Sequence, residues 1–482
     1  MSAEKKTGGK KPTYRIPESD GFWAKTSWQA SAVLALVGLG LCVFGFTQNP
    51  ERFGYAYLFG FFTVLTFAFG GLFYVLALHF TGGHWGLTAR RLAEIIGLSV
   101  VPTAILAIPL FAGVATGTFD LYDEWMGSHH GGHGEEHGGE HGEEHGDDHA
   151  EPAEGEGAHG EAEEHGSLFA PSVARAQEFP PQVDPQPPIR SHEVHTPQME
   201  AAHHHIIEHK SGYLNQGRWF GFAALYFLIW IGLAVFYFRS SVKQDDAPKK
   251  ERFELTNKMK KVSALGAIAF GLSLTFAAFD WLMALEGSWY STIFGVVIFA
   301  GSAVAVLALI IVLGIGLHRK GHIGNALNVE HFHDLGKLMF GFMCFWAYVS
   351  FSQWMLIWYA GIPEEQTWYH KRWQDGWKAW ALFMMIGHFG LPFYFLISRI
   401  VKRNLGMLRL GAIWLIFMHV CDIYVFVLPQ YGGFGPSAID FGALLFCGGV
   451  FFTFVFRMLM RVPLIPLGDP RLERALHHHQ SH

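Results

Sequence analysis

Charged residues are scarce in this chain. Asp, Glu, Lys and Arg make up 16% of its 482 residues, against about 25% in an ordinary soluble domain. Half of the residues are hydrophobic, and the few charges are clustered, so that long stretches carry none. This composition excludes a soluble globular protein and predicts an integral membrane protein that crosses the bilayer several times. We expect membrane lipid around it and no nucleic-acid partner.

Cysteine is also rare, and its spacing excludes several kinds of redox site. The four cysteines, Cys42, Cys344, Cys421 and Cys447, all lie in apolar stretches, and no CxxC or CxxCH sequence occurs. Iron–sulfur clusters, a disulfide framework and covalently attached haem are therefore not expected. We predict buried free thiols and no catalytic, cofactor-binding or metal-binding residue in this chain. A b-type haem between His388 and His419 is an alternative, because both lie at similar depth in consecutive apolar stretches.

Ten stretches are long and apolar enough to cross a membrane as helices, each of which needs about 20 residues. They lie near residues 27–47, 54–80, 92–117, 216–239, 262–285, 290–317, 336–360, 377–400, 409–429 and 438–460. Strands are not expected, because lipid requires internal backbone pairing and these runs are too long for the strands of a barrel. The prediction is an all-α polytopic membrane protein.

Lys and Arg are distributed unevenly between the two ends of these spans, which predicts their orientation. Most of them lie in both termini and in the loops at 81–91, 240–261, 318–337 and 399–409. Because basic loops stay in the cytoplasm, we place both termini there. The first span is too long for a signal peptide and lacks a cleavage site. The predicted organisation is a basic tail at 1–26, helices at 27–117, a periplasmic loop at 118–215, helices at 216–461 and a tail at 462–482.

The long loop has two parts of biased composition. His133, His137, His141, His145 and His149 recur at every fourth position among Gly and Glu, and a Pro-rich part follows. Neither part can bury a core, so we expect both to be largely disordered unless a partner covers them. Rows of imidazoles can bind Zn, Ni or Cu, but the abundant Gly disfavours an aligned helix. A solvated acidic arm is favoured over a metal site.

Polar and ionisable residues inside the spans are the candidate functional residues. A charged group at the bilayer centre costs about 2.5–3.5 kcal/mol even on the lower scales, so it must be neutralised, paired or turned toward a polar interior. Buried carboxylic acids and imidazoles are suited to exchanging protons near neutral pH. The candidates for a proton path are Asp280, Glu286, His333, Asp334, Lys337, Ser350, Gln353, His388, His419, Asp422 and Asp440.

Their positions along the spans suggest two half-paths with a group between them. The cytoplasmic half-path would hold His333, Asp334 and Lys337, and the periplasmic one Asp280, Glu286 and Asp440. His388, His419 and Asp422 would lie between the two.

Each group also has a structural alternative. Glu286 and Asp440 suit the water interface, and His333, Asp334 and Lys337 suit a solvated helix start. His419 and Asp422 share a helix face and suit a structural hydrogen-bonded pair. A packing role is the alternative for Asp280 and His388.

Tryptophans gather near the outer ends of the later spans: Trp281, Trp289, Trp354, Trp358, Trp368, Trp373, Trp377 and Trp380. Most are typical of the aromatic belt at a membrane–water interface. Some of them would also suit the floor of a quinone pocket, and the sequence does not separate the two uses.

Five segments carry a resemblance to a known family. They are FDWLMALE at 279–286, STIFG at 291–295, HDLGK at 333–337, FWAYVSFSQ at 345–353 and IWYAGIPEE at 357–365. These segments resemble the F-type subunits of bacterial alternative complex III, which belong to the polysulfide-reductase (NrfD-like) family of membrane subunits. The resemblance covers most of residues 255–460, whereas the earlier spans agree only in length and order. The His-rich loop is not part of it.

The resemblance implies an architecture and a set of partners. The fold would be two four-helix bundles plus two further helices, in the bacterial inner membrane. The partners would be a homologous NrfD-like subunit and periplasmic subunits that carry haem c and iron–sulfur clusters. Menaquinol or another quinol would be oxidised in the sister subunit, close to a cluster. This chain would hold no cofactor and would be a candidate proton path.

Four functions follow from these observations. The favoured one is a non-redox subunit of a quinol:electron-acceptor oxidoreductase that supports quinol oxidation and conducts protons, so that Asp280→Asn would keep electron transfer and lose proton pumping. In the second, this chain binds the quinol, with Asp280 or Glu286 as proton acceptor. The third is a structural anchor, and the fourth is a secondary transporter, which is weakened by the lack of broken helices.

Overall fold

The structure is a computed structural model that describes residues 14–126 and 205–477. The predicted His-rich and Pro-rich parts of the long loop lie outside the described residues. Within these two ranges the regular structure is entirely helical, and ten helices are long and apolar enough to cross a membrane. The prediction of an all-α protein with about ten spans is therefore confirmed.

The spans follow one another in chain order, and several are made of more than one helical segment. They are η1 (Gly21–Thr26) with α1 (Ser27–Gln48), α2 (Pro50–Thr81), η2 (Leu87–Ala89) with α3 (Arg90–Leu98) and α4 (Val100–Ala115), α7 (Gln216–Asp246), α8 (Lys249–Trp281) with η3 (Met283–Leu285), α9 (Phe294–Arg319), α10 (Val329–Ala360), α12 (Trp377–Met384) with η5 (Met385–Gly390) and α13 (Leu391–Ile397), α15 (Leu405–Val427) with η6 (Leu428–Gln430), and α16 (Ala438–Arg461). Several helices begin earlier than their apolar stretch, α8 by 13 residues, because helical pairing continues into the polar flanks.

Short helices lie at the two ends of the spans. The end that carries α5 (Asp123–Met126) and α11 (Pro363–Lys371) is called the loop end. The opposite end carries η4 (Gly324–Ala326), α14 (Arg399–Arg403) and α17 (Leu472–Leu476) and is called the terminal end. The sequence predicts that the terminal end faces the cytoplasm.

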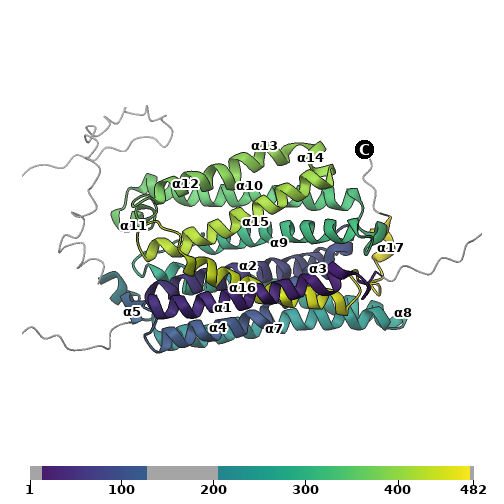
Figure 1. Cartoon of the computed structure of the whole chain (residues 1–482), viewed down its shortest axis with the longest axis horizontal. Coiled ribbons are helices and arrows are strands. Elements are labelled where there is room, and N and C mark those ends of the chain that lie inside the picture. Colours follow the sequence, from purple (N-terminus) through teal and green to yellow (C-terminus); the bar gives the residue numbers. More distant parts are fainter. Residues whose placement is uncertain (1–13, 127–204, 478–482) are drawn as a thin grey trace, which may run out of the picture. The chain divides into compact units, whose positions relative to one another are not determined.

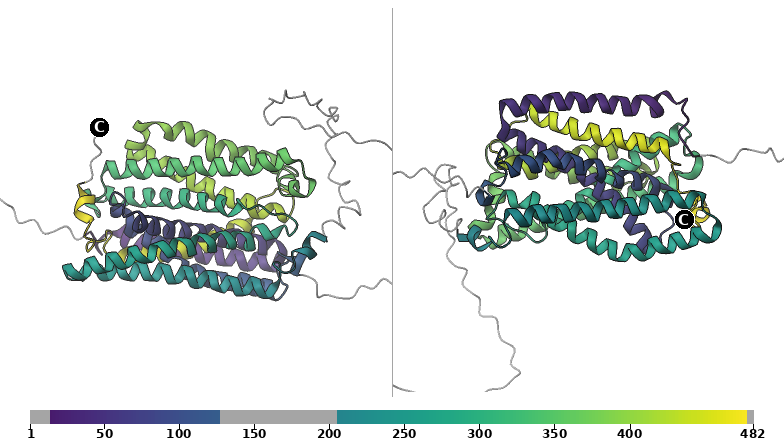
Figure 2. Two further views of the ribbon diagram at one scale, coloured as in Figure 1. Left: turned by 180° about the vertical axis from the view of Figure 1, so that it is seen from behind. Right: turned by 90° about the horizontal axis from the view of Figure 1, so that it is seen from below.

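The long helices run side by side (Figures 1 and 2), and their contacts divide most of them into two bundles. In the first bundle, α2 packs with α3–α4, α7 and α8. In the second bundle, α9 packs with α10 and α15, and α13 packs in turn against α10 and α15. Helices α1 and α16 form a pair that lies against α2. The two bundles meet mainly through α2 and α9, which are the most buried spans. This arrangement agrees with the expected pair of bundles plus two further helices.

Glycines let α1 and α16 approach closely. A Cβ atom at Gly38 of α1 would lie 2.3 Å from the Phe446 backbone nitrogen of α16, and one at Gly449 would lie 2.5 Å from the Ala35 nitrogen. Close packing of backbones is a main source of helix association in lipid, where apolar side chains gain little by leaving it.

Gly38→Val is therefore expected to separate α1 from α16 and to lower the free energy of unfolding by about 1–3 kcal/mol or more. The matched control is Gly40→Val on the same helix, because no atom lies within 4 Å of a Cβ at Gly40. Unfolding in mixed micelles measures both variants, and equal stabilities would contradict this account of the pair.

Candidate functional site

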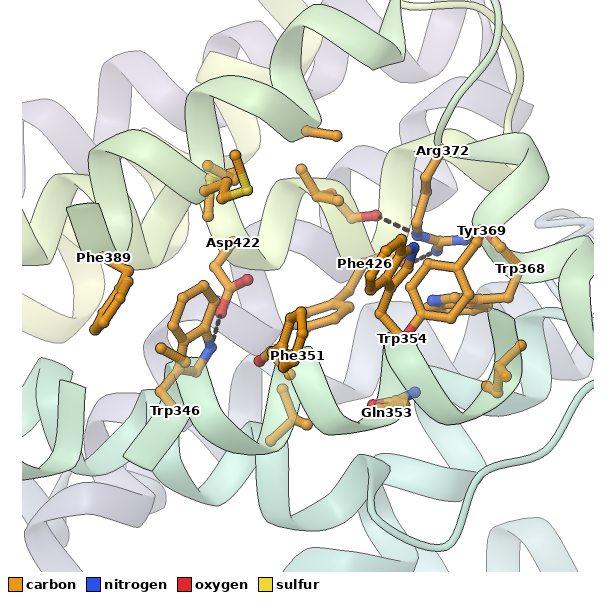
Figure 3. A pocket seen from close by; sticks show the side chains of 18 of the residues that line it. Trp346, Phe351, Gln353, Trp354, Trp368, Tyr369, Arg372, Phe389, Asp422 and Phe426 are labelled. Carbon is orange, nitrogen blue, oxygen red and sulfur yellow. Dashed lines mark hydrogen bonds between the residues drawn. The ribbon is translucent and has the colours of Figure 1, made fainter. Parts of the chain in front are cut away.

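A large groove lies toward the loop end of the second bundle, between α10, α11, α12 and α15 (Figure 3). Its volume is about 1070 Å³, which is slightly above the usual range for ligand pockets. Flat rings form much of the wall: Trp346, Phe351, Trp354, Trp358, Trp368, Tyr369, Trp373, Phe389 and Phe426. At its edge Tyr348, Trp358 and Met385 are exposed, so a molecule dissolved in lipid would reach the groove sideways.

One carboxylic acid, Asp422 of α15, lies in the wall of this groove. It is 5% exposed, and its Oδ2 accepts a hydrogen bond of 3.0 Å from Nε1 of Trp346 on α10. No Lys, Arg or His ion pair with Asp422 occurs among the described residues. Ser350 and Gln353 of α10 lie in the same wall, and the Ser350 hydroxyl has no hydrogen-bond partner in the described part of the chain.

Behind Asp422, His419 lies in the interface between α15, α2 and α9. The Thr66 hydroxyl donates to the carbonyl of Thr63, so it accepts from Nε2 of His419 at 2.7 Å. This tautomer leaves Nδ1 of His419 as a free acceptor. A Cβ at Gly301 of α9 would lie 3.3 Å from that Nδ1 and 3.6 Å from Asp422 Oδ2. The imidazole and the carboxyl group therefore border the same point, as their spacing along one helix face predicted.

His388 is the second buried imidazole of this region. It lies in η5, a π-helical turn of the eighth span, and its ring packs on Trp346 with the centroids 3.8 Å apart. It is fully buried, and within the described ranges neither ring nitrogen has a hydrogen-bond partner. Trp346 thus contacts His388 with its ring face and Asp422 with its N–H. We call His388, His419, Asp422 and Trp346 the central cluster.

Arg372, which follows α11, places a cation near the loop-side end of the groove. Its guanidinium donates to the carbonyls of Trp368, Val425 and Phe426 at 2.8–3.0 Å and stacks on the Trp368 ring. Burial lowers the pKa of Arg372 to about 9, so the group remains a cation at neutral pH. It joins α11 to the end of α15, and the groove thus has a cation toward one end and an acid deeper inside.

Asp280 is held by three side chains at the loop end of the first bundle. Its Oδ1 accepts from Arg218 at 2.7 Å and from the Tyr213 hydroxyl at 2.8 Å, and its Oδ2 accepts from the Tyr226 hydroxyl at 2.7 Å. The indole of Trp219 donates to the Asp280 carbonyl. Burial raises the pKa of Tyr213, so this hydroxyl stays protonated and donates to the carboxylate.

The other two predicted loop-side carboxylates are also paired. Glu286 lies 2.5 Å from Nζ of Lys371, and Asp440 lies 2.7 Å from Nη2 of Arg52. Asp440 also completes the capping box at the start of α16. All three loop-side acids thus join two parts of the chain, and none of them lines the groove.

The predicted cytoplasmic candidates lie at the terminal end, at the start of α10. Asp334 pairs with Lys337 at 2.7 Å. His333 is 5% exposed, and its Nδ1 lacks a partner among the described residues. The structure therefore brings together Ser350, Gln353 and Asp422 in one wall and His388 and His419 behind it, and it keeps the remaining candidates apart.

Sequence reasoning missed several residues that these sites use. Trp346 lies inside one of the resembling segments, and Arg372 follows another. Neither could be recognised as a site residue from the sequence, because aromatic residues within spans and cations near a membrane interface are both common. The buried ion pairs that Arg90 and Arg91 form with Glu94 on α3 were also missed. His79 at the end of α2 was not among the candidates either; it is 1% exposed and stacks on Tyr237.

No family model matches the chain, and no curated protein matches it. Over residues 14–126 and 205–477, the fold and its apolar helices define an all-helical, multi-pass integral membrane protein with ten candidate spans.

Proposed function

We propose that this protein is a non-redox membrane subunit of a respiratory quinol:electron-acceptor oxidoreductase, and that protons pass through its central cluster. The sequence segments that resemble the NrfD-like family support the assembly, with a homologous membrane subunit and with periplasmic haem c and iron–sulfur subunits as partners. Both termini would lie in the cytoplasm and the long loop in the periplasm.

The single observation that carries proton transfer is the difference in pairing among the buried acids. Asp280, Glu286 and Asp440 are each fixed by an arginine or a lysine, which favours the charged form and opposes protonation. Among the described residues Asp422 has no such cation, and it lies beside His419, whose Nδ1 has no partner there. An acid in this setting can be neutral in one step and charged in the next, as a proton carrier must.

The geometry also suggests the order of groups. A proton on Asp422 would face the free Nδ1 of His419 across the space beside Gly301, and His388 packs on the ring of Trp346, which donates to Asp422. The groove would connect Asp422 toward the loop end, where Gln353 and Ser350 add polar atoms.

Purification from native membranes in mild detergent, followed by reconstitution in liposomes, tests the proposal. We expect multihaem and iron–sulfur subunits to travel with this chain, and quinol-driven electron transfer to move more protons than quinol oxidation itself releases. A chain that purifies alone and without colour would overturn the assembly. An assembly that moves no additional protons would overturn the proton-transfer role.

The groove favours a second candidate function, in which this chain binds the quinol. Its flat aromatic walls suit a ring, its open edge faces lipid, and Arg372 and Asp422 supply a donor and an acceptor for the two oxygens. The acceptor of a quinol proton would then be Asp422 rather than Asp280 or Glu286. The two electrons would pass to a cofactor of a partner subunit.

Photolabelling of the assembly with a quinone analogue separates the two candidates. Label on peptides that contain Trp354 and Trp358, reduced at least about tenfold by Trp354→Ala, supports binding in the groove. Trp28→Ala on α1 is the matched control, because Trp28 lies outside the groove. Label confined to a partner subunit would contradict quinol binding by this chain.

A further inference from the structure

The chain does not leave the membrane domain where α16 ends. Residues 464–476, which we call the C-terminal strap, continue across the terminal ends of the helices and finish in α17 (Figure 1). Leu464 and Ile465 are fully buried, and the Leu464 N–H donates to the carbonyl of Tyr14 at 2.8 Å. At the far end, Nε2 of His331 on α10 lies 2.9 Å from the Ala475 carbonyl. The strap is therefore attached at both ends.

Under the strap, α3 begins with two arginines that are fully buried, which is unusual for this residue type. Arg90 and Arg91 both pair with Glu94, at 2.9 and 3.2 Å. Arg91 also pairs with Asp245 at the end of α7, at 2.8 Å. These four residues alone have two positive and two negative charges.

The strap adds one cation and one anion to this network. Asp469 lies 2.5 Å from Arg90 and 2.9 Å from Arg471. Although burial opposes ionisation, the charge of Arg90 and the hydrogen bond from Arg471 hold the pKa of Asp469 below its usual range. The complete network therefore has three cations and three anions, and Asp469 is the strap residue that pairs directly with α3.

The backbone of the strap also fits closely against α7. A Cβ at Gly468 would lie 1.8 Å from the carbonyl oxygen of Gln244, and the Gly468 N–H donates to Asp245 at 3.1 Å. No side chain can be accommodated at this position unless the strap moves away from the helix end.

Two polar side chains are closed in beneath these contacts. Thr88 in η2, which contacts α17, is 1% exposed, and its hydroxyl has no partner in the described ranges. His79 at the end of α2 is equally buried, and neither of its ring nitrogens has one there. Water that reached this region from the terminal side would meet a titratable group between the helices of the first bundle.

We propose that the C-terminal strap is a seal that closes the terminal end of the first bundle against water, with Asp469 as the residue that holds it down. The seal goes beyond proton transfer through the central cluster, since it lies in the other bundle. A protein that moves protons by one route must keep other routes dry, and the strap performs this task for the bundle that contains His79.

A thiol placed under the strap tests the seal. Thr88→Cys is a small change that puts a reactive group there, and the full-length protein is probed with a membrane-impermeant maleimide in native membranes opened by freezing and thawing. The native cysteines all lie in spans and are measured in the same digest. We expect slow labelling of the residue-88 thiol, and labelling that is about a hundredfold faster when Asp469→Asn is added, since loss of one partner of a buried ion pair shifts opening on this scale.

Glu473→Gln is the matched control, because it removes the same charge from an exposed position of the same strap. It should leave the labelling rate unchanged. Fast labelling of the Thr88→Cys protein alone, or equal rates with and without Asp469→Asn, would overturn the proposal.

Hydrogen exchange on the unaltered protein is a second test of the seal, which can be made even if the Asp469→Asn protein does not accumulate in the membrane. The amides of residues 464–476 should exchange at least about a hundredfold more slowly than in a free peptide. Exchange at the rate of the free peptide would show that the strap does not close the bundle.

Discussion

Asp422→Asn should abolish the proton translocation that exceeds the release by quinol oxidation itself, while quinol-driven electron transfer continues. Asparagine keeps the size of the side chain and an oxygen that accepts from Trp346, so the groove and the 3.0 Å hydrogen bond are retained. It cannot take up or release a proton near neutral pH. We therefore expect the number of protons moved per electron to fall to the value set by quinol oxidation itself, because a carrier that cannot titrate blocks the path.

The measurement is the proton-to-electron ratio in liposomes with the substituted subunit. Asp334→Asn is the matched control, since it removes a carboxylate from an ion pair at the terminal end, far from the central cluster. We expect it to retain the unaltered ratio. An unaltered ratio in Asp422→Asn would exclude this residue as the carrier, and a loss in Asp334→Asn would return the path to the candidates that the sequence placed at the cytoplasmic edge.

Among the substitutions considered for stability, Asp280→Ala should cause the largest fall in the free energy of unfolding. Removal of this carboxylate leaves Arg218, Tyr213 and Tyr226 without the acceptor that they share. The loss of one partner of a buried, hydrogen-bonded ion pair costs about 3–5 kcal/mol. Helices α7 and α8 are joined at this point, so the free energy of unfolding in mixed micelles should fall by that amount.

Tyr226→Phe provides the comparison, because it removes one hydrogen bond and leaves the ion pair intact. It should cost about 1 kcal/mol. Asp280→Asn separates the two roles of this residue, since it keeps the oxygen and removes the charge. A stable Asp280→Asn protein that transfers electrons and moves no additional protons would identify Asp280 as the carrier, as the sequence alone favoured.

The aromatic groove was only partly predictable. The sequence predicted that some outer tryptophans would suit a pocket, and Trp354, Trp358, Trp368 and Trp373 do line it. It did not predict that Asp422 would be the acid in this wall. The reason is that α10, α11, α12 and α15 come together only when the helices pack. The pattern of apolar residues within one helix shows which residues avoid water, but it does not identify the helix that lies next to them.

Local sequence determined the class of this protein. Runs of about 20 apolar residues require helices in lipid, because the backbone must pair within each segment. The number of spans, their order and the residues that lie inside them follow from this rule. The proximity of His419 and Asp422 follows as well, since a spacing of three places both on one face of a helix.

Tertiary structure decided which of the buried groups are paired. Asp280 and Arg218 are 62 residues apart, and Asp440 and Arg52 are 388 apart. The same is true of the ion pair between Arg90 and Asp469, which joins the C-terminal strap to α3. Hydropathy is a property of each segment, so the sequence alone shows that a carboxylate inside an apolar span is energetically unfavourable. Whether an arginine from another helix lies beside that carboxylate depends on how the helices pack, and this packing separates a fixed anion such as Asp280 from an acid such as Asp422.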